Sequence, residues 1–273
     1  MGPSPLVEFF KRGEVERDVR LLAAQGALAP RAHDQLAILV LLLEDSDTHI
    51  REIADRTIRR IPDAALSKFL ARSDVAISLR EFFAGRGILP AQPAADAGSA
   101  AGADASGRTA NQADDDAPLI VDESEEPAEQ DRQETDDSMM QRIAKMGFTE
   151  RLRAAMKGSR EMRAILIRDP NKMIAAAVLS SPKLSEQEVE AISRMANVSD
   201  DVLRTIGSNR AWTRHYGVVV GLTKNPKTPL AMSMNLMQRL TDRDLGQLSV
   251  DRNIPEPLRV AARKKMLTNT GKG

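Results

Sequence analysis

The chain has 273 residues, a length that suits two domains or one extended repeat domain with a buried core. It contains no cysteine, which excludes disulfide frameworks, thiolate zinc sites, cysteine-ligated iron–sulfur clusters and cysteine nucleophiles. The 39 basic and 39 acidic residues give a formal net charge of zero, which taken alone argues against nucleic-acid binding.

The apolar runs of the chain predict a soluble protein. The first ten residues show neither the charged region nor the long apolar core of a secretion signal. The longest apolar run, residues 36–43, is much shorter than the roughly 20 residues that a membrane-spanning helix needs. We therefore expect a cytoplasmic protein without membrane association.

Residues 1–90 predict an N-terminal helical domain. Helical spacing of apolar residues indicates helices over 14–25 and 31–44, and two shorter helices around 66–70 and 79–83. Another helix is indicated by apolar residues that recur every three or four positions, namely Ile50, Ile53, Ala54, Ile58 and Ile61. Residues 45–47 supply a cap before this helix, and Pro62 supplies a stop after it. No stretch of useful length alternates with the period of a strand, so the predicted fold is all-α.

Residues 91–137 differ abruptly from the segments on either side. Small, polar and acidic residues dominate, and Leu119, Ile120 and Val121 are a brief apolar break. Such a composition cannot bury enough apolar surface to offset the entropy of ordering the chain. The sequence therefore predicts a disordered acidic linker between two folded parts.

Charge is distributed unevenly along the chain. Residues 1–90 are neutral, the linker holds 2 Arg and 14 acidic residues (net −12), and residues 138–273 hold 24 basic and 12 acidic residues (net +12). A flexible linker of this length reaches about 35–40 Å, so it can fold back on the basic domain. We expect it either to mask that domain from acidic ligands or to act only as a soluble spacer.

Residues 138–273 contain a repeat with a period of 28 residues. The units begin at Asp169, Asn197, Asn225 and Asn253. Apolar residues recur at fixed distances from these starts: Ile174, Val202, Leu230 and Leu258, then Val178, Ile206, Met234 and Ala262, and later Ile192, Val220 and Leu248. Two short helices per unit, stacked on their neighbours, would build the continuous core of an α-solenoid.

These units resemble known helical repeats. Residues 197–203, 225–230 and 253–258 look like leucine-rich-repeat-variant and HEAT-like α-solenoids, and residues 43–51 are similar to the aspartate turn of such repeats. Residues 168–172 and 225–229 also resemble bacterial proteins of this kind. The resemblance implies two short HEAT-like domains with a scaffolding role and no reaction. Some members of these families carry a cysteine-bound iron–sulfur segment, which a chain without cysteine is not expected to hold.

The sequence offers little catalytic chemistry. His33, His49 and His215 are isolated from one another, and neither a Gly-rich phosphate loop nor a Gly-x-Ser-x-Gly elbow occurs. Glu186, Glu188 and Glu190 alternate along one predicted helix, so Glu186 and Glu190 share a face, which we expect to be solvated. We therefore expect a protein that is not an enzyme and that binds no metal and no cofactor.

Residues 210–216 hold the only Trp and the only Tyr of the chain. Trp212 and Tyr216 are four residues apart, which predicts one shared helical face, and Arg210 and Arg214 flank them. Trp, Tyr and Arg dominate interface hot spots, so this segment is a candidate partner-binding anchor. The alternative is a core position, because Trp212 occupies the repeat register of Leu184 and Leu240.

Basic residues also follow the repeat. Arg168, Lys224 and Arg252 each precede the start of a unit, and Lys227 adds to the excess of positive charge. A stack of units would align these cations along one edge. Cations in the last turn of a helix also favour the helix dipole, by about 0.3–1 kcal/mol each, so their register has a purely local explanation as well.

Three classes of function remain open from the sequence. The first is a protein–protein interaction scaffold whose basic C-terminal domain docks an acidic partner or a partner helix. The second is sequence-independent binding to nucleic-acid phosphates, against which the scarcity of aromatic residues argues. The third is a helical-repeat enzyme without a recognisable motif. The first class is favoured, with partner-binding residues Arg168, Arg210, Trp212, Arg214, Tyr216, Lys224, Lys227 and Arg252.

Overall fold

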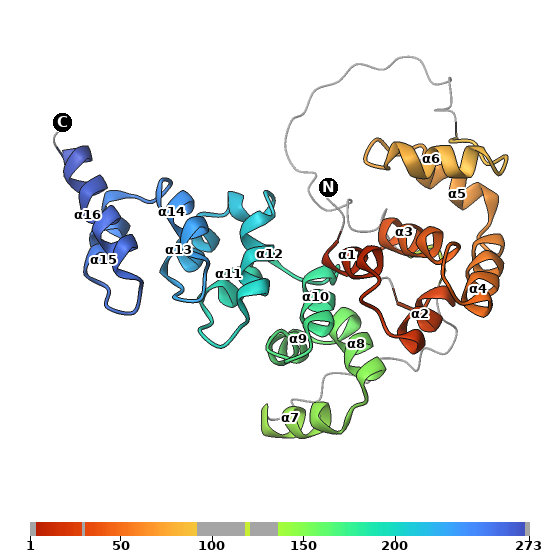
Figure 1. Cartoon of the computed structure of the whole chain (residues 1–273), viewed down its shortest axis with the longest axis horizontal. Coiled ribbons are helices and arrows are strands. Elements are labelled where there is room, and N and C mark those ends of the chain that lie inside the picture. Colours follow the sequence, from red (N-terminus) through yellow and green to blue (C-terminus); the bar gives the residue numbers. More distant parts are fainter. Residues whose placement is uncertain (1–3, 29–30, 92–117, 121–135, 271–273) are drawn as a thin grey trace, which may run out of the picture. The chain divides into compact units, whose positions relative to one another are not determined.

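The computed structural model of the protein describes residues 4–28, 31–91, 118–120 and 136–270 (Figure 1). Across these ranges it has sixteen α-helices, one short 3-10 helix and no strand, which confirms the predicted all-α fold. The helices belong to two compact units, Met1–Gln133 and Glu134–Gly273. Among the described helices, none has both the length and the hydropathy that crossing a bilayer would require.

The N-terminal unit contains six helices of two to three turns. They are α1 (Pro5–Arg12), α2 (Arg17–Ala24), α3 (Ala32–Leu42), α4 (Thr48–Arg59), α5 (Asp63–Leu70) and α6 (Ile77–Ala84). Helix α3 lies beside α1, α2 and α4, so it occupies the middle of the unit. This position explains why α3 carries the most apolar stretch of the chain: its neighbours cover it on several sides.

Helix α4 forms as its sequence pattern predicts. Ile50, Ala54 and Ile58 are buried, and they place one continuous apolar stripe against the neighbouring helices. The Asp47 carboxylate accepts a hydrogen bond from the backbone N–H of His49 at 2.9 Å, which satisfies one of the free donors at the helix start. Pro62 follows the end of α4 and becomes the N-cap residue of α5.

Most of the predicted linker lies outside the described residues. The described parts of 91–137 are Ala91, residues 118–120, and Asp136 and Asp137 at the start of a helix. The backbone N–H of Ala91 donates to the carbonyl oxygen of Ser67 at 2.8 Å. Residues 118–120 lie against the N-terminal unit, where Gln35 binds their backbone. The predicted apolar break of the linker is therefore a contact segment, because Leu119 and Ile120 find a partner surface.

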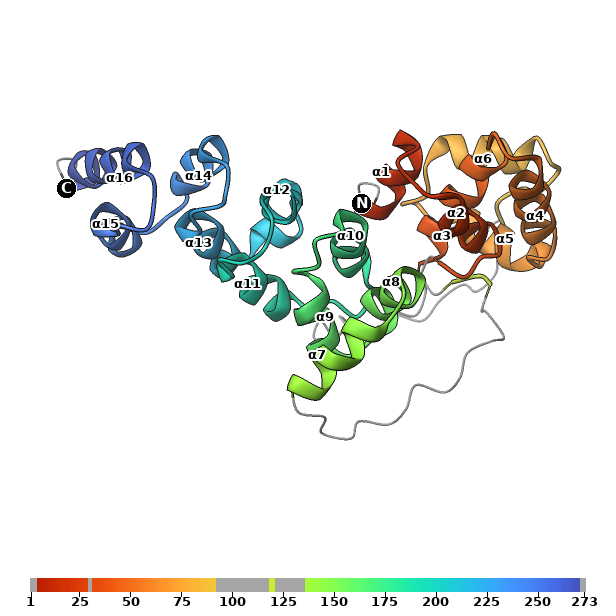
Figure 2. The same ribbon diagram turned by 60° about the horizontal axis from the view of Figure 1, so that its bottom comes forward.

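The C-terminal unit contains the remaining helices. They are α7 (Asp136–Lys145), α8 (Phe148–Lys157), α9 (Arg160–Leu166), α10 (Lys172–Ser180), α11 (Glu186–Arg194), α12 (Asp200–Ser208), the 3-10 helix η1 (Trp212–Arg214), α13 (Tyr216–Lys224), α14 (Leu230–Met237), α15 (Asp242–Val250) and α16 (Glu256–Thr270). Figure 2 shows α10, α12, α14 and α16 following one another in one row and α9, α11, α13 and α15 in a second row. Neighbouring helices contact one another within and between the rows.

Hydroxyl side chains cap the starts of several of these short helices. Ser159, Ser185, Ser199 and Thr241 are the N-cap residues of α9, α11, α12 and α15, and each accepts a hydrogen bond from the backbone N–H three residues later. At α11 the Glu188 carboxylate also accepts from the backbone N–H of Ser185, which completes a capping box. Caps of this kind stabilise a helix by about 1 kcal/mol, which matters for helices of only two turns.

The 28-residue register is reflected in the burial of most of its positions. Ile174, Val202 and Leu258 are buried five residues after their starts, and Val178, Ile206 and Ala262 are buried nine residues after them. The unit that begins at Asn225 departs from this pattern, because Leu230 is 39% exposed. Helix α14 begins at Leu230 itself, five residues after Asn225, whereas α10 and α12 begin three residues after their starts. Leu230 is thus the first residue of its helix, whereas the buried Ile174 and Val202 are the third residues of theirs.

Candidate protein-binding surface

A short connection between α12 and α13 presents the aromatic and basic residues singled out in the sequence. The Asn209 side chain accepts a hydrogen bond from the backbone N–H of Ala211 at 2.9 Å. The backbone N–H and the hydroxyl of Thr213 both donate to the carbonyl oxygen of Asn209 at 3.0 Å. Thr213 is buried, whereas Arg210 and Arg214 are exposed. These contacts fix a tight turn whose outer side carries the two arginines.

Trp212 and Tyr216 do not share a helical face, so the sequence prediction on this point is wrong. Trp212 begins the 3-10 helix η1, and Tyr216 begins α13. Between them His215 is extended, with φ −76° and ψ 120°, and this break changes the direction of the chain. Trp212 is half-buried, as is Leu184 at the equivalent repeat position, while Leu240 is buried.

Tyr216 uses its hydroxyl group within the C-terminal unit. It donates to a carboxylate oxygen of Asp244 at 2.5 Å and accepts from the backbone N–H of Thr241 at 3.0 Å. Lys224 Nζ lies 3.2 Å from the other Asp244 oxygen. The hydrogen bond from Tyr216, joined by those from Thr241 and Lys224, outweighs burial and holds the pKa of Asp244 below its usual range. The Tyr216 hydroxyl therefore ties α13 to the start of α15.

Three of the predicted partner-binding cations have intramolecular partners. Lys224 binds Asp244 and also donates to the side-chain oxygen of Gln247 at 2.7 Å. Lys227 Nζ donates to the carbonyl oxygen of Val198 at 3.2 Å, and Arg168 Nε donates to that of Ala164 at 2.9 Å. These contacts satisfy backbone carbonyl groups and one carboxylate. Lys224, Lys227 and Arg168 are thus less available to a partner than the other predicted cations.

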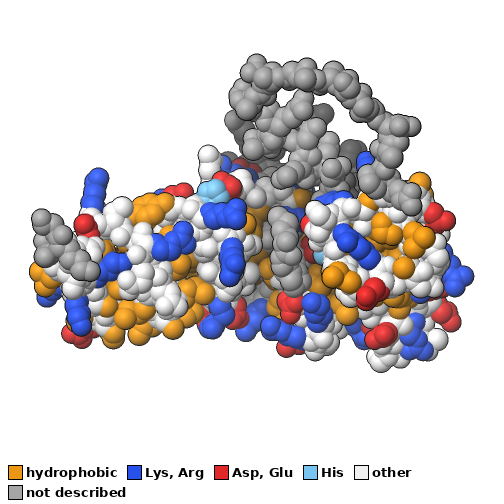
Figure 3. Space-filling model, turned by 90° about the horizontal axis from the view of Figure 1, so that it is seen from above, with side chains coloured by type: hydrophobic (Ala, Val, Ile, Leu, Met, Phe, Trp, Pro, Cys, Tyr) orange, Lys and Arg blue, Asp and Glu red, His pale blue; other side chains and the backbone are white. Residues whose placement is uncertain are grey.

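Other cations of the C-terminal unit remain available. Within the described residues, the exposed side chains of Arg210, Arg214 and Arg252 make no hydrogen bond or ion pair. Five basic residues that were not singled out as binding residues in the sequence likewise make no side-chain hydrogen bond or ion pair: Arg239, Arg243, Arg263 and Lys264, which are exposed, and Arg259, which is half-buried. Figure 3 shows Lys and Arg side chains spaced along the visible face of this unit, with hydrophobic side chains among them. This set of cations, with Trp212, is the candidate protein-binding surface.

The candidate surface includes one acidic contact. His215 Nε2 lies 2.7 Å from a carboxylate oxygen of Glu186, and both side chains are more than a third exposed. Glu186 is on α11, so the contact ties the turn before α13 to the neighbouring helix. Arg210 and Arg214 both precede His215 in the chain and take no part in this contact.

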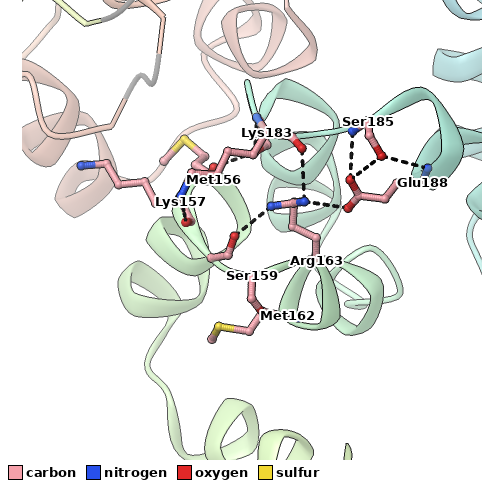
Figure 4. Close-up of polar contacts among 10 residues, drawn as sticks. Met156, Lys157, Ser159, Met162, Arg163, Lys183, Ser185 and Glu188 are labelled. Carbon is pink, nitrogen blue, oxygen red and sulfur yellow. Dashed lines mark hydrogen bonds and ion pairs between the residues drawn. The ribbon is translucent and has the colours of Figure 1, made fainter. Parts of the chain in front are cut away.

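Glu188 of α11 is internal, whereas Glu186 is exposed and Glu190 is half-buried. The Glu188 carboxylate oxygen Oε1 lies 2.7 Å from Nη2 of Arg163, and the two side chains are 9% and 5% exposed (Figure 4). Arg163 also donates to the carbonyl oxygens of Gly158 and Lys183, at 2.8 and 3.2 Å. The sequence does not reveal this pair, because 25 residues separate its members.

The hydrogen-bond donors around Glu188 favour its charged form. Burial raises the pKa of Glu188, but hydrogen bonds from the backbone N–H of Ser185, from Arg163 and from the Ser185 hydroxyl together lower it below the usual range. The pair thus links α9 to α11 inside the fold and offers nothing to a ligand.

The chain gives no match to a family model, to a curated protein or to a solved structure. Within the described ranges, no three His, Asp or Glu side chains are grouped so that they could hold a metal ion. The charges and the exposed groups of the C-terminal unit are the features that point to a function.

Proposed function

We propose that the chain is a non-enzymatic scaffold whose basic C-terminal unit docks an acidic protein partner. The observation that carries the proposal is the set of exposed cations without intramolecular partners, which includes Arg210, Arg214 and Arg252. An exposed cation without an intramolecular partner can pair with an incoming carboxylate without first breaking a contact. Complementary charge of this kind steers association and selects among partners.

We further propose that the C-terminal unit is a short α-solenoid of the HEAT-like type. Supporting this are the two rows of short helices (Figure 2), the capping of helix starts by Ser and Thr, and the burial of most register positions. Stacked helix pairs of this kind offer an extended surface on which a partner helix or an acidic segment can lie. Such a surface suits a scaffold, which binds other proteins and carries out no reaction.

An acidic protein suits the surface better than nucleic acid does. Acidic residues stand beside the free cations: Asp242 and Asp244 flank Arg243, and Asp251 precedes Arg252. Such alternation weakens the continuous positive potential that tracks a phosphate backbone. Stacking of bases is limited too, because residues 138–273 contain only three Phe, Trp or Tyr residues, namely Phe148, Trp212 and Tyr216, and Trp212 is half-buried.

The acidic segment of the chain itself supplies a competitor for the same surface. Residues 91–137 carry a net charge of −12, equal in size and opposite in sign to that of residues 138–273. We propose that this segment masks the basic unit until an acidic partner of higher affinity displaces it. Mass action then sets a threshold concentration that a partner must exceed.

Two labelled probes test the proposal with the full chain: a poly-glutamate peptide, and a random-sequence DNA duplex as the alternative ligand. Fluorescence anisotropy is recorded for both across a salt series. We expect saturable poly-glutamate binding that weakens as salt rises, and weaker binding of the duplex under the same conditions. Tighter binding of the duplex, with a steep salt dependence, would overturn the proposal in favour of nucleic acid.

A further inference from the structure

Gln35 of α3 binds residues 118–120 through their backbone. Its side-chain nitrogen donates to the carbonyl oxygens of Gly26 and Ile120, at 2.9 and 3.0 Å. Its side-chain oxygen accepts from the backbone N–H groups of Leu119 and Ile120, at 2.9 and 3.1 Å. A side-chain amide has two donor hydrogens and two acceptor lone pairs, so the four contacts use its full capacity.

Because Gln35 is buried, its side chain depends on these hydrogen bonds and cannot replace them with water. The residue is only 1% exposed, and Gly26 supplies just one of its four partners from the helical part of the unit. The other three come from Leu119 and Ile120, about 85 residues further along the chain. A buried amide that loses such partners is left with an unsatisfied donor and acceptor, which is costly. Gln35 is therefore a buried polar group whose hydrogen bonds come mostly from the backbone of a segment outside the six helices of the unit.

Gly26 shapes the same place for the side chain of Ile120. Its φ of +83° belongs to the left-handed region that favours glycine, and it follows Gln25, the C-cap residue of α2. A Cβ atom added there would lie 3.2 Å from Cγ2 and 3.3 Å from Cβ of Ile120. Gly26 thus gives the chain its turn and also leaves the room that the branched side chain occupies.

The sequence around Ile120 suits a short recognition segment. Pro118, Leu119, Ile120 and Val121 form the one apolar run in an otherwise polar, acidic stretch. Pro118 restricts its own backbone and that of the residue before it, which reduces the entropy that the segment loses on binding. Acidic residues flank this run in the sequence, so the apolar residues are the part of the segment that gains most from contact with a buried surface.

From these observations we propose that the N-terminal unit carries a peptide-binding site at Gln35 and Gly26. Its ligand is a short apolar, non-helical peptide with two consecutive free backbone N–H groups, and residues 118–120 of the same chain occupy it in cis. The site is independent of the acidic-partner surface proposed for the C-terminal unit. It ties the middle of the acidic segment to the N-terminal unit.

Hydrogen exchange in the full chain tests whether residues 118–120 occupy the site at Gln35 and Gly26. The backbone N–H groups of Leu119 and Ile120 should exchange at least about tenfold more slowly than in a free peptide of the same sequence. This protection should be lost in Gln35→Leu and kept in Gln25→Leu, a matched change at an exposed position. Protection that does not vary with protein concentration supports binding in cis. Absent protection, or protection that grows with concentration and so comes from a second copy, overturns the assignment.

A second arm leaves Gln35 unchanged, so that it stays informative if Gln35→Leu fails to fold. The full chain with Leu119→Asp and Ile120→Asp has an empty site, and the probe is a synthetic peptide that copies residues 116–122. We expect this variant to bind the peptide at least about tenfold more tightly than the native chain, whose own segment competes from a tether. A copy N-methylated at the Leu and Ile nitrogens should not bind. No binding to the folded variant, or equal binding of the methylated copy, would contradict the proposal.

Discussion

Arg163 and Glu188 form a buried ion pair that joins α9 to α11, with 2.7 Å between Nη2 and Oε1. Two backbone carbonyl groups and Ser185 complete the hydrogen bonding around it. Removing one partner of such a pair leaves a charge in a site that water reaches poorly, whereas an exposed pair contributes little.

Arg163→Met should therefore destabilise the C-terminal unit by about 3–5 kcal/mol. Arg194→Met is the matched control, because Arg194 pairs with Glu190 on the exposed side of α11, and its loss should cost at most about 0.5 kcal/mol. Urea unfolding followed by the fluorescence of Trp212, the only tryptophan, measures both. Equal costs for the two variants would show that the Arg163 pair is not the internal link described above.

The lowered pKa of Glu188 predicts a stability that depends on pH. The folded unit favours the carboxylate, so the unfolded chain binds more protons at acidic pH and stability rises with pH. The contribution is fully present above the ordinary glutamate pKa of about 4.3 and is lost as the pH falls through the lower folded value. The urea midpoint of the Trp212 signal should fall on acidification, and less steeply in Glu188→Gln. If the urea midpoint of Glu188→Gln fell as steeply on acidification as that of the native chain, the acid sensitivity would come from other groups.

Two glycines of the C-terminal unit should respond in opposite ways to alanine. At Gly221 of α13 a Cβ would lie 2.0 Å from the Ser193 hydroxyl oxygen of α11, so Gly221→Ala should cost about 1–3 kcal/mol. At Gly246 of α15 the nearest atom would be 3.8 Å away, an ordinary contact. Gly246→Ala should therefore stabilise its helix by about 0.4–1 kcal/mol. The same urea experiment compares them, and a stabilising Gly221→Ala would contradict the close packing of α11 on α13.

The sequence predicted those parts of the fold that depend on local patterns. The apolar stripe of α4 is an example, since Ile50, Ala54 and Ile58 are all buried as their spacing requires. It did not predict contacts between residues far apart in the chain, such as Arg163 with Glu188, because composition and periodicity carry no information on which elements pair.

At the candidate surface the sequence identified the segment but not its geometry. The extended His215 separates Trp212 from Tyr216, and helical spacing alone cannot indicate such a break. Whether a cation is free or bound also depends on distant groups, as Lys227 with the carbonyl oxygen of Val198 shows. A signal for the Gln35 contact was present, however, because the apolar run at 119–121 stands out in an acidic segment.

Masking by the acidic segment predicts a gain of affinity when its charge is removed. Neutralising Asp122, Glu123, Glu125 and Glu126 to the corresponding amides should tighten poly-glutamate binding at low salt, because the competing charge is reduced. The difference from the native chain should shrink as salt rises, since screening weakens both interactions. Anisotropy titrations at low and high salt measure this effect, and unchanged affinity at low salt would leave the segment as a spacer only.

Charge reversal at the turn before α13 tests the proposed docking most directly. Arg210→Glu with Arg214→Glu is compared with Arg56→Glu and Arg60→Glu, an equal change at exposed cations of the N-terminal unit that have no side-chain partner in the described structure. Docking through the C-terminal unit predicts that the first pair weakens poly-glutamate binding at least about tenfold, or 1.4 kcal/mol, while the second leaves it nearly unchanged. Equal losses from the two pairs would mean that net charge alone governs binding, and they would contradict the proposed surface.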